Sequence, residues 1–174
     1  MKKEILIITD IWGMSNSDWI NLYVLSLERN YKVSIYDSHK LGLIDATNLC
    51  EKAIHEKFIN GGIDRAVEKL INQRPDIFSV IGFSIGGLIA WRACLQGFKV
   101  ETLIAVSSTR LRYEKVKPNC NIFLIYGQED KFKPDENWFK TLNINHAIIE
   151  GQGHEVYKNS EIMPHLLQKL KSIL

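Results

Sequence analysis

The feature that most constrains the fold of this chain is an apolar run that ends in Gly-x-Ser-x-Gly-Gly. Residues 80–87 read Val-Ile-Gly-Phe-Ser-Ile-Gly-Gly and lead directly into a helix-like segment that continues to Leu95. β-branched residues favour a buried strand, and the glycines on both sides of Ser84 leave room for a sharp turn into the helix. A serine on such a strained turn is typical of a nucleophile. The pattern therefore predicts an α/β fold with a reactive Ser84.

A reactive serine needs a base to take its proton and an acid to orient that base. After a turn of this kind, the acid and then the histidine are expected downstream, in that order. Asp130 follows the apolar run 122–126 in the sequence Gly-Gln-Glu-Asp, and His154 follows the apolar run 147–149 in Gly-Gln-Gly-His. The carboxyl ends of parallel strands share one edge of a sheet. We therefore predict a catalytic triad of Ser84, Asp130 and His154.

Some neighbouring residues leave alternatives open. Glu129 could orient the histidine in place of Asp130, although Asp130 is preferred. Asp10, at the end of the first apolar run, either touches the substrate or braces the histidine, or is a solvated or helix-capping carboxylate, which we favour. Of the remaining histidines, His55 and His165 are expected on the surface, and His146 at the opposite edge of the sheet. An alternative is left open for His39, which follows the second strand and could line the site.

Apolar patterning alternates between strands and helices along the chain. Strands are predicted over residues 4–9, 32–36, 77–83, 100–106, 121–126 and 144–149. Helices are predicted over 18–29 with Ser17 as N-cap, over 45–72 with a break at Gly61–Gly62, and over 86–96, 134–141 and 162–174. This spacing predicts a three-layer α/β/α sandwich around a mostly parallel sheet of about six strands, in a single domain over residues 1–174. Residues 107–119 are too few for a cap domain.

Composition narrows the class of partner and the compartment. The 22 basic residues nearly balance the 20 acidic ones, which gives no reason to expect nucleic acid or a membrane surface as a partner. The apolar run 5–8 is too short for a signal peptide or a membrane span. Three widely spaced cysteines, without the spacing of a zinc site, indicate free thiols. We therefore expect a cytoplasmic protein without a metal or other cofactor.

The motifs together resemble the α/β-hydrolase superfamily. The resemblance rests on Gly-Phe-Ser-Ile-Gly at residues 82–86, Gly-Gln-Glu-Asp at 127–130 and Gly-His at 153–154, and it extends over almost the whole sequence. It implies a minimal, lidless form of this fold. Residues 8–13, Ile-Thr-Asp-Ile-Trp-Gly, are similar to the acidic-Ile-aromatic-Gly loop of dienelactone-hydrolase-like proteins. Those proteins commonly carry a cysteine where this chain has Ser84.

Acyl transfer also requires donors for the oxyanion that forms when serine attacks. The backbone N–H of Ile85, which follows the nucleophile, is the first expected donor. Similarity to the dienelactone-hydrolase loop implies Ile11 as the second, with Trp12 next. Trp12 is also a candidate for substrate binding. Arg110, in the basic stretch at the carboxyl edge of the sheet, could bind a substrate carboxylate or phosphate; the alternative is a solvated basic loop.

Three functions agree with these features. The leading hypothesis is a serine hydrolase that cleaves a small carboxylic ester or thioester through an acyl-enzyme intermediate. A dienelactone-hydrolase-like lactonase or C–C hydrolase is the first alternative, and Arg110 or Arg112 would then matter for binding a small charged lactone. The second alternative is a non-catalytic interaction module on a hydrolase scaffold.

Overall fold

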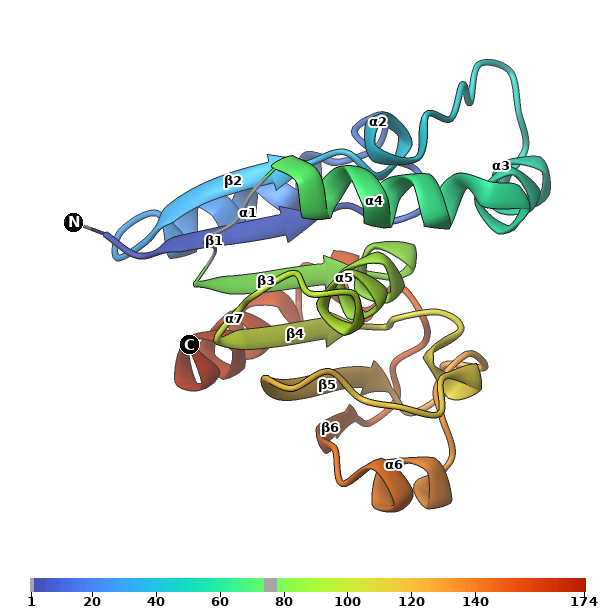
Figure 1. The fold of residues 1–174 in the computed structure, drawn as a ribbon. Coiled ribbons are helices and arrows are strands. Elements are labelled where there is room, and N and C mark those ends of the chain that lie inside the picture. Colours follow the sequence, from blue (N-terminus) through green and yellow to red (C-terminus); the bar gives the residue numbers. More distant parts are fainter. Residues whose placement is uncertain (1, 74–77) are drawn as a thin grey trace.

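The computed structural model describes residues 2–73 and 78–174, in which six parallel strands form a single sheet (Figure 1). The strands lie in the order β2-β1-β3-β4-β5-β6. Their bounds are β1 (Glu4–Ile8), β2 (Lys32–Tyr36), β3 (Ser79–Phe83), β4 (Thr102–Val106), β5 (Asn121–Gly127) and β6 (Asn145–Ile149). Because every neighbouring pair is parallel, all the carboxyl ends lie at one edge of the sheet.

Helices cover both faces of this sheet. They are α1 (Asp18–Leu27), α2 (Ser38–Gly42), α3 (Glu51–Lys57), the π-helical turn η1 (Phe58–Gly62), α4 (Ile63–Gln73), α5 (Ile85–Leu95), the 3₁₀ turn η2 (Leu111–Tyr113), α6 (Glu136–Leu142), the 3₁₀ turn η3 (Val156–Lys158) and α7 (Met163–Ile173). Helices α1 and α7 pack on one face, and α4, α5 and α6 pack on the other (Figure 1). The predicted three-layer sandwich is confirmed.

The strand sequences explain why both faces need a helical layer. In β1, Ile5 and Ile7 pack against the α1 and α7 side, whereas Leu6 and Ile8 pack against the α4 and α5 side. All four side chains are fully buried. Since side chains alternate along a strand, a continuous apolar strand must be covered from both sides.

The predicted strands are observed with ends that differ by two residues or fewer, a difference typical of strand ends. Ile77, the first residue of the predicted strand 77–83, lies outside the described residues. Between β4 and β5, residues 107–120 form only the short turn η2, so no cap domain is inserted there. None of the helices in the described part of the chain has the length and apolar character needed to cross a bilayer.

The helical region before β3 differs most from the prediction. Helix α2 begins at Ser38, in a stretch that was not predicted to be helical. The predicted break at Gly61–Gly62 is observed as a kink within η1, where Asn60 and Gly61 leave helical geometry and Gly61 has a φ of 97°. Ser17 precedes α1 as predicted, but its hydroxyl donates to the Met14 carbonyl at 2.9 Å and does not cap the helix.

Candidate active site

Ser84 occupies the turn between β3 and α5, with φ 50° and ψ −116°. This conformation is costly for any residue with a side chain and is found mainly at functional sites. The flanking glycines allow the chain to approach closely at this turn. A Cβ on Gly86 would lie 2.6 Å from the Ile8 carbonyl oxygen, and one on Gly82 would lie 2.5 Å from the Gly87 Cα. The Gly-x-Ser-x-Gly-Gly pattern is therefore a steric requirement of the turn.

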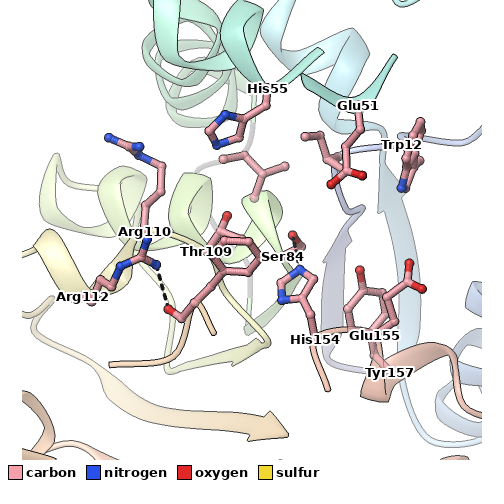
Figure 2. A pocket seen from close by; sticks show the side chains of 13 residues that line it. Trp12, Glu51, His55, Ser84, Thr109, Arg110, Arg112, His154, Glu155 and Tyr157 are labelled. Atoms are coloured by element: carbon pink, nitrogen blue, oxygen red, sulfur yellow. Dashed lines mark hydrogen bonds between the residues drawn. The ribbon is translucent and has the colours of Figure 1, made fainter. Parts of the chain in front are cut away.

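Ser84, His154 and Asp130 form a chain of hydrogen bonds (Figure 2 shows Ser84 and His154). The distance from Ser84 Oγ to His154 Nε2 is 3.1 Å, and that from His154 Nδ1 to Asp130 Oδ2 is 2.9 Å. A proton on Nδ1 is donated to the carboxylate, which leaves Nε2 free to accept the serine proton. Asp130 is buried, whereas Glu129 is exposed. Of the two acids that the sequence left open, Asp130 is the one that contacts His154.

Phe132 secures the loop that carries Asp130. Its N–H donates to Asp130 Oδ1 at 2.8 Å, and its carbonyl accepts a hydrogen bond from Arg112 Nη1 at 2.9 Å. Its ring packs edge-on against the His154 imidazole, with 5.1 Å between centroids. Both carboxylate oxygens of Asp130 are thus engaged, and the guanidinium of Arg112 is used to hold this loop.

A cavity of about 560 Å³ lies above Ser84 at the carboxyl edge of the sheet (Figure 2). Arg110 and Arg112 lie on one side of it, and Trp12 and Glu155 lie on the other (Figure 2). Its lining combines the segments of Ser84 and His154 with four other segments, namely α3 and the loops after β1, β4 and β5. The lining residues are Ile11, Trp12, Glu51, His55, Ser84, Ile85, Thr109, Arg110, Arg112, Phe132, His154, Glu155 and Tyr157. The predicted residues Trp12, Ile11, Ile85 and Arg110 therefore share one cavity with Ser84.

Several cavity residues were not predicted. The prediction that His55 lies on the surface is wrong, since it is half-buried and lines the cavity with Glu51, one helical turn earlier on α3. Glu155 directly follows His154, and Phe132 lies two residues after Asp130. This closeness to predicted catalytic residues was the only feature of the sequence that could have indicated that they line the cavity. Helix α3 reaches the cavity through tertiary packing, which no local pattern in the sequence indicates.

Arg110 differs from Arg112 in having a guanidinium that donates to no other described residue. It adopts a left-handed backbone conformation with φ 68° and lies over the Tyr113 ring, 5.2 Å from its centroid. Burial, and then the positive charge of Arg110, lower the pKa of His55 below its usual 6.5. This side of the cavity therefore has an unpaired cation beside an imidazole that tends to stay neutral.

Asp10 is fully buried and has polar partners on both oxygens. Its Oδ1 accepts from the Trp12 N–H at 3.0 Å. Its Oδ2 accepts from the Tyr157 hydroxyl at 3.1 Å and pairs with Lys158 Nζ at 2.9 Å. The favoured prediction of a solvated or helix-capping carboxylate is thus wrong, and Asp10 does not contact His154 either. It connects the loop after β1 to the loop that carries the histidine.

The pKa shifts of Tyr157 and Lys158 are consistent with this connection between the two loops. Burial, and then the negative charge of Asp10, raise the pKa of Tyr157, so its hydroxyl remains a donor. Burial alone would lower the pKa of Lys158, but its hydrogen bonds to Glu155 and Asp10 outweigh burial and raise it. Lys158 is therefore a permanent cation that neutralises two carboxylates next to the cavity.

The two amides predicted to bind the oxyanion have no acceptor within the described part of the chain. Ile11 and Ile85 both line the cavity beside Ser84, whereas the Trp12 N–H is already used by Asp10. His39 does not line the cavity, contrary to one alternative; its Nε2 donates to the Ile11 carbonyl at 2.6 Å. The described residues contain no group of three or more His, Cys, Asp or Glu side chains suited to hold a metal ion.

Comparison with known proteins adds one sequence relative. No family model matches the chain. A curated pimeloyl-[acyl-carrier protein] methyl ester esterase from Shewanella woodyi is 30% identical over 105 residues, which are 60% of this chain and 36% of that protein. The match thus spans little more than a third of the relative's length.

Solved structures resemble the chain over nearly its whole length. One assigned to the alpha/beta hydrolase superfamily, from Xanthomonas campestris, has a TM-score of 0.67 at 13% identity and covers 99% of this chain and 100% of that chain. One assigned as a dienelactone hydrolase, from Klebsiella pneumoniae, has a TM-score of 0.70 at 13% identity, with coverages of 98% and 85%. The esterase domain of a Rhodothermus marinus protein has a TM-score of 0.65 at 12% identity, also with 98% and 85%.

At these identities the likeness is one of fold. It agrees with the parallel sheet of six described strands and with the strand-to-helix turn at Ser84. The chain therefore has the fold of the α/β-hydrolase superfamily.

Proposed function

We propose that the protein is a serine hydrolase that cleaves a small carboxylic ester or thioester through an acyl-enzyme intermediate. The observation that carries this proposal is the hydrogen-bonded chain from Ser84 through His154 to Asp130, at the floor of a cavity. The name of the Shewanella woodyi relative, an esterase, favours the same class of reaction.

The geometry supports a two-step mechanism. Ser84 Oγ attacks the substrate carbonyl carbon while His154 Nε2 takes the hydroxyl proton, and Asp130 holds the imidazole in the required tautomer. The carbonyl oxygen becomes an oxyanion that accepts hydrogen bonds from the N–H groups of Ile85 and Ile11. His154 then returns the proton to the leaving alcohol or thiol. Water, activated by His154, releases the acid and regenerates Ser84.

The experiment is covalent labelling with a fluorophosphonate probe followed by kinetics on a short acyl ester. The wild type should be labelled, whereas Ser84→Ala and His154→Ala should not. Asp130→Asn should lose about 10³–10⁴-fold in kcat, because the amide no longer selects the required imidazole tautomer. Glu129→Gln is the matched control and should stay near the wild-type rate. A folded wild type that resists labelling would contradict the proposal and favour a non-catalytic interaction module.

A second candidate substrate is a small anionic lactone, and the unpaired guanidinium of Arg110 favours it. A guanidinium can bind a carboxylate through two parallel hydrogen bonds. If this substrate is the right one, a lactone with a free carboxylate should exceed its neutral methyl ester in kcat/KM, and Arg110→Gln should abolish the difference. Equal rates for the two lactones would exclude it and leave simple acyl esters as the substrates.

A further inference from the structure

The two peptide units that flank Ile11 have four backbone polar groups, of which three are hydrogen-bonded. The Asp10 carbonyl accepts from Ser38 Oγ at 2.6 Å and from the Gly13 N–H at 3.1 Å. The Ile11 carbonyl accepts from His39 Nε2 at 2.6 Å, and the Trp12 N–H donates to Asp10 Oδ1 at 3.0 Å. The fourth group, the Ile11 N–H, donates to none of the residues that the structure describes.

These bonds fix the direction of the Ile11 N–H. A trans peptide unit is planar, so its N–H points opposite to its C=O. Ser38 and Gly13 hold the Asp10 carbonyl, and the amide on the other side of the same plane must therefore point away from them. Ile11 lines the cavity together with Ser84 and Ile85. The His39 bond fixes the next peptide plane, so the loop cannot rotate about Ile11 without breaking it.

Ser38 and His39 are themselves held firmly at the start of α2, beyond the carboxyl ends of β1 and β2 (Figure 1). Thr9 Oγ1 accepts from the Ser38 N–H at 2.9 Å and donates to Ser38 Oγ at 3.1 Å. Asp37 Oδ1 accepts from the His39 N–H at 2.9 Å. Thr9 and Ser38 are fully buried, where such a chain of hydrogen bonds is stronger than it would be in water.

We propose that Ser38 and His39 are positioning residues, which aim the Ile11 amide at the oxyanion through the two carbonyls that flank it. The proposal rests on the proposed function, because the amide is useful only if an oxyanion forms at Ser84. Neither side chain lines the cavity. Their contribution is to keep a donor oriented before the reaction begins, so that no reorganisation is needed when charge develops.

The test compares Ser38→Ala with the control Ser34→Ala. Ser34 lies on β2, and its hydroxyl donates to Glu4 Oε1 at 2.8 Å, so the control removes a serine hydrogen bond away from the loop. Ser38→Ala removes two, the bond to the Asp10 carbonyl and the bond from Thr9 Oγ1. Removing an oxyanion donor costs about 10²–10³-fold in kcat, and a misaligned donor should cost less, about tenfold. We expect this loss in kcat for Ser38→Ala, with little change in KM, and near wild-type kinetics for Ser34→Ala.

Three measurements separate positioning from a merely structural role. The endpoint of fluorophosphonate labelling gives the fraction of competent enzyme, to which kcat is normalised. A trifluoromethyl ketone, which forms an oxyanion with Ser84, should lose affinity in Ser38→Ala by the same factor as kcat/KM, whereas the matching methyl ketone should not. The acid limb of the pH profile of kcat/KM, which reports the base His154, should not move.

Replacement of His39 provides an independent check by rescue. His39→Gln retains a side-chain N–H donor for the Ile11 carbonyl, whereas His39→Leu does not. The glutamine variant should therefore keep much more of kcat than the leucine variant.

The outcomes distinguish the two proposals. A labelled, active wild type whose Ser38→Ala variant keeps its trifluoromethyl ketone affinity would overturn the positioning role and leave the hydrolase proposal intact. A wild type that neither reacts with the probe nor cleaves esters would overturn both.

Discussion

Ser84 has a backbone conformation that alters the usual stability ranking of small residues. At most positions glycine is less stable than alanine by about 0.5–1 kcal/mol. At φ 50° and ψ −116°, alanine retains a strain of about 1–3 kcal/mol that glycine relieves. We expect Ser84→Gly to exceed Ser84→Ala by about 1 kcal/mol in free energy of unfolding, measured by urea denaturation. Glycine and alanine at Ser34, on β2, should show the usual ranking; the same ranking at both positions would contradict the strain.

The residues predicted from sequence are those whose positions are set by a local motif. The glycines around Ser84 and the short loops that end in Asp130 and His154 each follow an apolar strand, so chain order and strand ends sufficed to predict all three. Asp10 could not be interpreted in this way. Its partner Lys158 lies far along the chain, and only the folded structure brings the two together.

The ion pair between Lys158, at the end of η3, and Asp10, after β1, joins two loops of the site. Lys158→Met would leave a buried carboxylate without its cation, which typically costs about 3–5 kcal/mol for a fully buried pair. Because Lys158 retains some solvent contact, we expect a loss of about 2 kcal/mol. The double variant Asp10→Asn/Lys158→Met should recover part of it in urea denaturation. A double variant as unstable as the sum of the single variants would show that the pair is not coupled.

Helix α3 and the loop after β4 meet at the cavity through His55 and Arg110. Burial and the charge of Arg110 both lower the pKa of His55, so Arg110→Gln should raise it part of the way toward 6.5, the remaining depression being due to burial. An NMR titration of the imidazole measures this. Arg112→Gln is the control and should move the pKa less. An unchanged pKa in Arg110→Gln would mean that the two elements do not meet in solution.

The same pKa has a consequence for stability. Since the folded state lowers the pKa of His55, it disfavours the protonated form. The contribution of His55 to the free energy of unfolding is therefore present above the unfolded-state pKa of about 6.5. It is lost as the pH falls through that value toward the lower folded-state pKa.

The helices and strands themselves could be predicted from apolar periodicity. The approach of α3 to Arg110 depends on how α3 packs, which periodicity does not encode.

For the molecule as a whole, a continuous apolar sheet with helices between the strands made the three layers predictable. The shape of the cavity was not predictable, because it is built from segments at five strand ends and from α3. Its walls depend on tertiary distances, whereas the sequence indicates only which residues follow which strand.

If the protein cleaves esters as proposed, the size of the cavity, with no cap domain inserted after β4, limits the acyl group. Each buried methylene contributes about 0.8 kcal/mol, or about fourfold in kcat/KM. For a series of p-nitrophenyl esters we expect such increments from acetate to about hexanoate, and none beyond, once further methylenes extend into water. Ser84→Ala provides the background rate. A steady rise as far as dodecanoate would contradict this limit.

The connection of Asp10 to Lys158 also bears on synthesis of the chain. The proposed nucleophile and acid are both present once β5 and its following loop have been made, but the proposed base and the partners of Asp10 come only after β6. A polypeptide interrupted before residue 154 therefore lacks both the base proposed for Ser84 and the cation that pairs with Asp10. Under the proposed function, a chain interrupted before residue 154 cannot cleave esters, so activity requires synthesis through β6 and the loop that follows it.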